Sequence, residues 1–437
     1  MRESDMVKRA AFYGWTLVAV LFLTDLLLMG LPYYSVINTY MLKQIHMSRS
    51  IYGLGFTVTN LFYGLPSTLV AIVILRWGLR TTFAVGAALL LCGTLWLAFF
   101  VHEPWEYLLS FGVLIGTGFA FTTNVPISTA ITRWFKRYRG RAMAIALSGA
   151  GVGGFVGSPM VDRFLTAHQG DWQQAWKIMA ALVILAGLTA VFFVKERPED
   201  LGQTADGSLR EIPTQGIVAK SDLRITNLSW TPSEAYRSLP FWLIVIGGIA
   251  CKFPLFFMLS HWVLHLRGAG ISAAAAATAL GVFTITQVPG QLVGGWLVDK
   301  IPARYALMLG FCCYLSGAYL AIRVASDTIF LANAAAMLFG IGFGWTFIAV
   351  YTSMGHFYGP GPYPKLTGML ALLSSVIAAP SGAIAGKLFD SYGNYTPALE
   401  LIGLISLAGM VAVAFAKIPR ISKKPEGAPG VAAMRAE

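Results

Sequence analysis

Two charged side chains lie in the middle of long apolar runs. Asp25 stands ten residues after the start of one run at residue 15, and Lys252 stands eleven residues after the start of another at residue 241. At a rise of 1.5 Å per residue both lie ~15 Å along a helix, about halfway across a hydrocarbon layer of ~30 Å. An ionisable residue at that depth usually marks a substrate or proton pathway. We therefore expect Asp25 and Lys252 to bind substrate or carry a coupling proton, and a purely structural salt bridge between them is the alternative.

Other polar side chains in the apolar runs are weaker candidates, because each either lines a wet cavity or bonds to a neighbouring helix. Gln287 and Gln291 are four residues apart and share one helix face. The remaining candidates for the substrate site are Tyr34, Asn124, Trp345 and Tyr351. No catalytic triad, paired-carboxylate site or zinc signature stands out, so we expect neither enzyme activity nor a metal or cofactor.

The elements that position these side chains are long apolar runs. Hydrophobic residues make up 56% of the 437-residue chain and charged residues only 12%, about half of the roughly 25% usual in soluble domains. A soluble enzyme and a disordered chain are both excluded, because many of the runs exceed the ~18 residues that mark a membrane helix. We expect helices at 15–40, 51–75, 81–101, 107–131, 142–165, 176–194 and 241–266, and five more that start near Ala274, Ala303, Ile329, Leu366 and Thr396.

One long polar segment, 195–239, divides these runs into two sets of six. It holds six basic and seven acidic residues and too few large apolar residues to form a core. The chain is therefore predicted to contain a six-helix bundle at 1–194, a linker at 195–239, a second bundle at 240–418 and a tail at 419–437. The predicted fold is an all-α membrane protein, with twelve transmembrane helices in two six-helix bundles.

The net charge of +12 is explained by where the basic residues lie. If both termini and the linker are on one side of the membrane, that side carries 24 basic residues and the opposite side carries 7. This bias predicts a multi-pass protein of the plasma (inner) membrane with both termini cytoplasmic. The charge therefore gives no reason to expect a nucleic-acid partner.

Two short turns on the predicted cytoplasmic side have similar residues. The turn after the second run contains Arg76, Gly78 and Arg80, and the turn after the eighth contains Gly295, Asp299, Lys300 and Arg304. The second turn resembles the G-x-x-x-D-[RK]-x-x-x-R signature of the major facilitator superfamily. In the first turn Leu75 stands where the signature has its acid. The resemblance implies that these residues control opening and closing on this side.

Further motifs resemble the monocarboxylate-transporter and oxalate/formate-exchanger branches of that superfamily. They are Phe12-Tyr13-Gly14-Trp15, Arg133-Trp134-Phe135, Glu196-Arg197-Pro198-Glu199-Asp200 and Gly290-Gln291-Leu292. The resemblance implies two bundles around a central cavity and transport by alternating access.

The chain departs from the branch at the residue that would hold a carboxylate. Relatives carry an Arg after the glycine of the eighth helix, whereas here Gln291 follows Gly290 and supplies no charge. Lys252 offers a replacement positive charge. We expect secondary active transport of a small organic anion, a carboxylate, by a monomer, with a proton as the candidate coupling ion.

Two other functions remain open. The first is efflux of a neutral or cationic organic compound, with Asp25 as its anchor. The second is a non-transporting membrane sensor, which would need a signalling domain, and the linker is too short and polar to be one.

Overall fold

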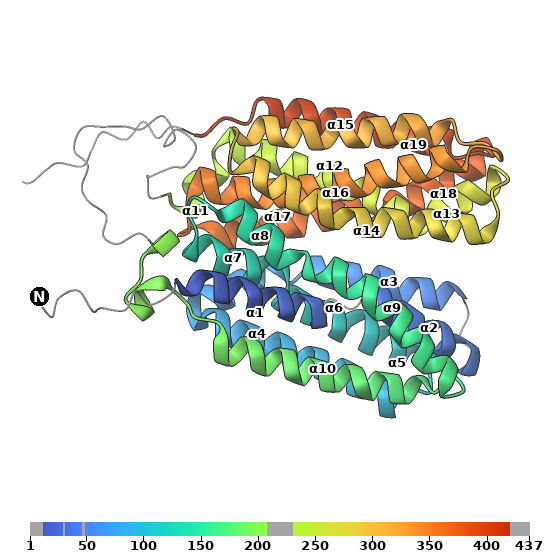
Figure 1. Cartoon of the computed structure of the whole chain (residues 1–437), viewed down its shortest axis with the longest axis horizontal. Helices are drawn as coiled ribbons and strands as arrows, with labels where there is room; N and C mark the ends of the chain where they lie inside the picture. Colours follow the sequence, from blue (N-terminus) through green and yellow to red (C-terminus); the bar gives the residue numbers. More distant parts are fainter. Residues whose placement is uncertain (1–11, 29–30, 46–48, 208–229, 420–437) are drawn as a thin grey trace, which may run out of the picture.

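The computed structural model describes residues 12–28, 31–45, 49–207 and 230–419, and within these ranges every regular element is a helix. The elements form two bundles that lie side by side (Figure 1). The first bundle consists of α1 (Tyr13–Leu28), α2 (Leu31–Gln44), α3 (Arg49–Gly64), α4 (Ser67–Phe99), α5 (Pro104–Tyr107), a π-helix (Leu108–Ile115), α6 (Gly116–Thr122), α7 (Asn124–Trp134), α8 (Arg139–Leu147), α9 (Gly149–Ala167) and α10 (Trp172–Phe193). The second consists of α12 (Leu239–Ser260), α13 (Trp262–Gly268), α14 (Ala273–Val298), α15 (Ala303–Ile322), α16 (Ile329–Tyr358), α17 (Tyr363–Ala378), α18 (Ser381–Tyr392) and α19 (Thr396–Ala414).

The helices occupy the predicted apolar runs. α15, α16 and α19 begin at Ala303, Ile329 and Thr396, the residues at which the sequence placed them. In the described part of the chain, nine helical spans are long and apolar enough to cross a membrane. The prediction of an all-α membrane protein is confirmed.

Several predicted helices are interrupted, which the apolar pattern does not show. Residues 107–131 form a π-helix, α6 and α7, with a break at Thr123, whose backbone angles are φ −115° and ψ −116°. α4 consists of two helices that meet at a kink at Gly78, where φ is 85° and ψ is 177°. Glycine adopts this left-handed conformation without the steric penalty of other residues, so the predicted turn is present although it needs no separate loop.

Large apolar side chains point away from both bundles. Phe192 on α10 is 66% exposed, and Phe330 at the start of α16 is 78% exposed. Extended apolar surface of this kind is unfavourable in water and marks a partner surface. The bilayer is that partner for a bundle of membrane-length helices.

Both ends of the described chain and the start of the linker lie at the same end of the molecule, on the left in Figure 1. We call this the linker end. The two bundles meet chiefly through α8 against α14, and through α3 and α4 against α17. At the linker end the backbones touch: a Cβ atom added to Gly140 would lie 2.3 Å from the carbonyl oxygen of Gly295.

The linker begins as an ordered part of the first bundle. Residues 198–201 form a short 3-10 helix, and the region just before α12 contains the short helix α11 (Pro232–Tyr236). Trp230 is buried beside Tyr358 of α16, with the ring centroids 5.3 Å apart. The sequence indicated only a solvated segment here.

Candidate functional site

Lys252 lies in the middle of α12 and is buried, with 6% of its surface exposed. Its Nζ atom donates a hydrogen bond of 2.7 Å to the hydroxyl of Ser375 on α17. It also lies 5.7 Å from the centroid of the Tyr63 ring, which α3 contributes from the other bundle. The ammonium group therefore lies where the two bundles meet.

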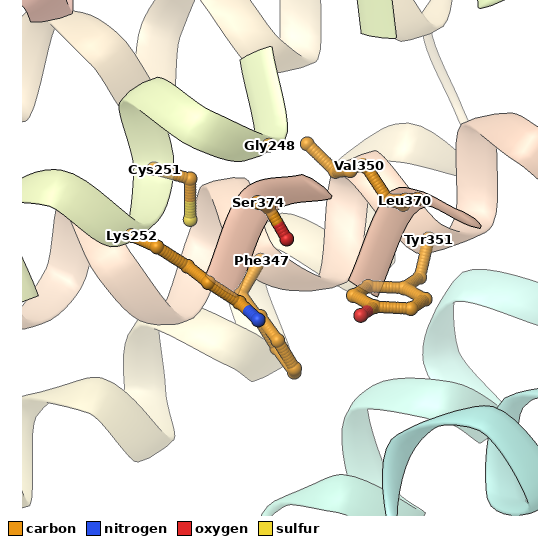
Figure 2. A pocket seen from close by; sticks show the side chains of 8 residues that line it. All are labelled: Gly248, Cys251, Lys252, Phe347, Val350, Tyr351, Leu370 and Ser374. Carbon is orange, nitrogen blue, oxygen red and sulfur yellow. The ribbon is translucent and has the colours of Figure 1, made fainter. Parts of the chain in front are cut away.

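A small cavity lies beside this ammonium group (Figure 2). Its volume is about 10 Å³, enough for about one water molecule. In Figure 2 the Lys252 nitrogen and the hydroxyl oxygens of Ser374 and Tyr351 lie around one space. The full lining is Gly248, Cys251, Lys252, Phe347, Val350, Tyr351, Leu370 and Ser374. The arrangement combines one cation and two hydroxyl groups with an apolar wall.

Tyr351 supplies an unused hydrogen-bond donor to this cavity. Its side chain is 2% exposed, and no group in the described residues hydrogen-bonds its hydroxyl. A buried polar group left unpaired costs roughly 1–3 kcal/mol. Such a group on a cavity is a candidate contact for a bound molecule.

Asn124 begins α7, directly after the break at Thr123. Its amide donates a hydrogen bond to the Tyr63 hydroxyl, and the Thr123 Oγ1 atom lies 3.3 Å from the same hydroxyl. Tyr63 thus connects the break in the first bundle to Lys252 in the second. Neither Tyr63 nor Ser375 could be recognised from the sequence, because tyrosine and serine are common in membrane helices.

Asp25 is buried in α1, with 2% of its surface exposed, and does not contact Lys252. Its Oδ2 atom accepts a hydrogen bond of 2.8 Å from the backbone N–H of Ala150, in the first turn of α9. A carboxylate is favoured at a helix N-terminus by the free N–H groups and the helix dipole. The ion pairs found among the described residues include neither Asp25 nor Lys252.

The other polar candidates fall into two places. Gln291 on α14 is 6% exposed. Among the described residues, neither its amide oxygen nor the indole nitrogen of Trp345 on α16 has a hydrogen-bond partner. Gln287 packs its backbone carbonyl against Gly344 of α16. Tyr34 lies instead in the core of the first bundle, with its ring centroid 5.0 Å from that of Trp176.

The turn after α14 joins the two bundles at the linker end. Asp299 accepts hydrogen bonds from the backbone N–H groups of Gly140, at 2.8 Å, and Arg141, at 3.0 Å, in the first turn of α8. The neighbouring basic residues contact side chains close to them in the sequence. Lys300 lies 4.0 Å from the ring centroid of Trp296, and Arg304 donates a hydrogen bond to the hydroxyl of Tyr305.

Burial changes the acidity of Asp299. It raises the pKa of this carboxyl to about 6, because loss of solvation outweighs the two backbone hydrogen bonds and the nearby Arg141 and Arg139, which lower it. The Nε2 atom of His356 on α16 lies 4.0 Å from the Asp299 Oδ1 atom. The junction between the bundles therefore contains a carboxyl that titrates near neutral pH.

The turn around Gly78, which lacks the acid of the signature, is bonded by a carboxylate from the linker. Glu196, in the linker, accepts hydrogen bonds from the backbone N–H groups of Leu79 and Arg80, directly after Gly78. It also forms an ion pair of 2.6 Å with Arg133, while the Arg80 Nε atom bonds the carbonyl of Val194. Arg76 is exposed. Glu196 acts within one bundle, whereas Asp299 connects two.

No group of three or more His, Cys, Asp or Glu side chains in the described ranges is placed to hold a metal ion.

Comparison with known families identifies the fold. The Major Facilitator Superfamily model matches residues 15–361, with a second, overlapping match at 264–435. Among solved structures, the transporter FucP in its outward conformation superposes with a TM-score of 0.69 at 13% identity, over 92% of this chain and 98% of FucP.

Curated relatives are transporters. Monocarboxylate transporter 13 of Bos taurus is 28% identical over 335 residues, which cover 76% of this chain and 72% of the relative. Monocarboxylate transporter 12 of Homo sapiens is 26% identical over 345 residues, covering 73% and 64% of the two chains. The riboflavin transporter MCH5 of Saccharomyces cerevisiae is 28% identical over 231 residues, covering 52% and 42%.

Proposed function

Because this chain belongs to the Major Facilitator Superfamily and is a secondary transporter, we propose that its substrate is a small organic anion, a carboxylate. The substrate binds at Lys252, beside the Tyr351 and Ser374 hydroxyl groups. The bundles then move relative to each other and expose this site to either side of the membrane in turn.

The uncompensated charge of Lys252 carries the proposal. A lysine at the bilayer centre costs roughly 2.5–3.5 kcal/mol on insertion scales, and its bonding partner in the structure is the neutral hydroxyl of Ser375. An ammonium group has three donors and no acceptor. A bound anion would supply both the missing negative charge and the missing acceptors.

The neighbouring groups suit an anion better than a cation. The Tyr351 hydroxyl is an unused donor on the same cavity. Asp25, the residue that would hold a cation, is already bonded to Ala150 and lies on a different element. Hydrogen bonds to a charged group contribute roughly 1.5–3 kcal/mol each, so Lys252 and Tyr351 together supply useful affinity.

We assign Asp25 the coupling proton rather than the substrate. Protonation would neutralise the carboxylate that holds the start of α9 against α1, which links proton binding to the position of a helix. Following the charge bias of the sequence, the linker end faces the cytoplasm of a plasma-membrane protein.

The test is uptake into proteoliposomes of a panel of mono- and dicarboxylates, with and without a pH gradient. Lys252→Met should reduce saturable carboxylate uptake at least about tenfold, since a lost charged hydrogen bond of 1.5–3 kcal/mol corresponds to that factor or more. Lys387→Met, which removes an exposed lysine on α18, is the matched control and should transport normally.

Two results would contradict the proposal. One is carboxylate uptake that survives Lys252→Met. The other is transport of organic cations only, abolished by Asp25→Asn, which would favour the alternative of cation efflux.

A further inference from the structure

The turn between α7 and α8 is held by two carboxylates that come from different parts of the chain. Asp206, in the linker, accepts hydrogen bonds from the backbone N–H groups of Lys136, at 3.1 Å, and Arg137, at 2.8 Å. Asp299, in the other bundle, accepts those of Gly140 and Arg141. Four N–H groups within six residues therefore bind two carboxylates, one on each side of the turn.

Asp206 belongs to a segment, residues 194–207, that crosses the linker end of the first bundle. We call this segment the strap. Besides Asp206, it is attached through Glu196 to Arg133, through the Lys195 carbonyl to the Trp134 indole at 3.2 Å, and through the Gln203 side chain to the backbone N–H of Tyr13 at 3.0 Å. Its contacts reach the start of α1, the Gly78 turn and the α7–α8 turn.

The conformation of Asp206 shows that the strap is shaped for this contact. Its φ of 61° is in the left-handed region, which residues other than glycine rarely adopt. Aspartate adopts this region several times more often than most residues, and here it presents its carboxylate to the N–H groups of Lys136 and Arg137.

The same turn leaves the second bundle no room for adjustment. Gly140 and Gly295 are in backbone contact, and an added Cβ on Gly140 would lie 2.8 Å from the Asp299 Oδ1 atom. The N–H groups that Asp299 binds lie four residues after those that Asp206 binds.

We propose that the strap controls the contact between the bundles. By fixing the N–H groups of Lys136 and Arg137, Asp206 sets the shape of the turn that Asp299 must meet, and so stabilises the conformation closed at the linker end. Detachment of the strap loosens the turn and weakens the Asp299 contact. This device acts on conformation and does not depend on which substrate is carried.

Hydrogen–deuterium exchange of the full-length protein, resolved to single residues by electron-transfer fragmentation, tests the coupling. Asp206→Gly removes the carboxylate while glycine keeps the positive φ without strain. Exchange should speed up at Lys136 and Arg137, because loss of hydrogen-bonded structure opens protected amides. If the strap controls the contact, exchange should also speed up at least about tenfold at Gly140 and Arg141, which Asp206 does not touch. Asp299→Ala should in turn speed exchange at Lys136 and Arg137.

The control is Asp200→Gly, since Asp200 is an exposed strap residue whose side chain accepts a hydrogen bond from the backbone N–H of Arg197, outside the α7–α8 turn. It should leave all four amides as in the native protein. Exchange that rises only at Lys136 and Arg137 in Asp206→Gly would overturn the proposal. If that variant exchanges faster throughout the chain, the reverse variant Asp299→Ala decides: unchanged exchange at Lys136 and Arg137 would then overturn the proposal.

Discussion

At the scale of single residues, Lys252 and Asp25 differ in how the protein compensates their charges. One Asp25 oxygen receives a backbone N–H at the start of a helix, where the helix dipole also favours a negative charge. Lys252 donates its hydrogen bond to the neutral hydroxyl of Ser375. The lysine is therefore the residue whose electrostatics are incomplete, and the substrate proposal rests on it.

Tyr351 allows binding to be separated from stability. Because its hydroxyl makes no hydrogen bond among the described residues, Tyr351→Phe should leave the melting temperature unchanged or slightly higher. If the hydroxyl contacts the anion, the same change should raise the KM for carboxylate uptake about tenfold or more, as expected for a lost bond to a charged group.

The matched control is Tyr314→Phe in the same bundle. The Tyr314 hydroxyl bonds the carbonyl of Cys251 at 2.8 Å, so its loss should lower the melting temperature. A raised KM in Tyr314→Phe together with an unchanged KM in Tyr351→Phe would contradict our assignment of the cavity.

The sequence identified the two buried charges but not their partners. A charged side chain in an apolar run is rare enough to be recognised from one sequence. Tyr63 and Ser375 are not rare, and their role depends on which helices the fold brings together. Tyr34 was equally plausible from its type, and its ring packs against Trp176 in the first bundle.

At the scale of elements, the close approach of α8 and α14 is the most demanding packing at the linker end. Gly140→Ala places a methyl group against the backbone of Gly295. Overpacking of this kind costs roughly 1–3 kcal/mol, and 1.4 kcal/mol corresponds to a factor of ten. The population of molecules separated at the linker end should therefore rise about tenfold.

Spin labels at exposed positions 77 and 305, one in each bundle, report this separation by pulsed electron–electron distance measurements. Gly281→Ala on α14, where an added Cβ meets no atom within 4 Å, is the control and should leave the distances unchanged. Unchanged distances in Gly140→Ala would mean that the contact does not limit closure.

Element positions were predictable because apolar length sets them, and α15, α16 and α19 begin where expected. The interruptions were not predictable. The π-helix at Leu108–Ile115 lies inside largely apolar sequence, so hydropathy gives no sign of it. The break at Thr123 lies in the polar run Thr122-Thr123-Asn124, just before Pro126, and a length-and-hydropathy criterion does not register it. The sequence identified Glu196 only as part of a motif. Its contact with the Gly78 turn could not be predicted, because the two are more than a hundred residues apart in the sequence.

At the scale of the whole molecule, the pKa of Asp299 makes closure depend on pH. When the bundles are joined, this pKa is about 6, raised from 3.8 by burial, and when they separate the carboxyl regains water and its ordinary value. The joined form therefore binds the proton more tightly. Its extra stability is fully present below about pH 4 and is lost as the pH rises through 6.

Lowering the pH from 7.5 to 5 should increase the joined fraction, measured with the same label pair. Asp299→Asn does not titrate, so its distances should not change around pH 6. His356 also faces Asp299, and His356→Gln separates its contribution. A pH response that Asp299→Asn retains in full would assign the effect to another group.

The contacts of the strap extend the first bundle beyond its last helix. By its helices alone the first half ends near Val194, yet Glu196, Gln203 and Asp206 satisfy backbone N–H groups that belong to that half. The contacts of the first half therefore extend at least to Asp206. A gene cut at codon 194 would encode six helices without the carboxylates that hold their turns, whereas one cut after codon 207 would keep Glu196, Gln203 and Asp206.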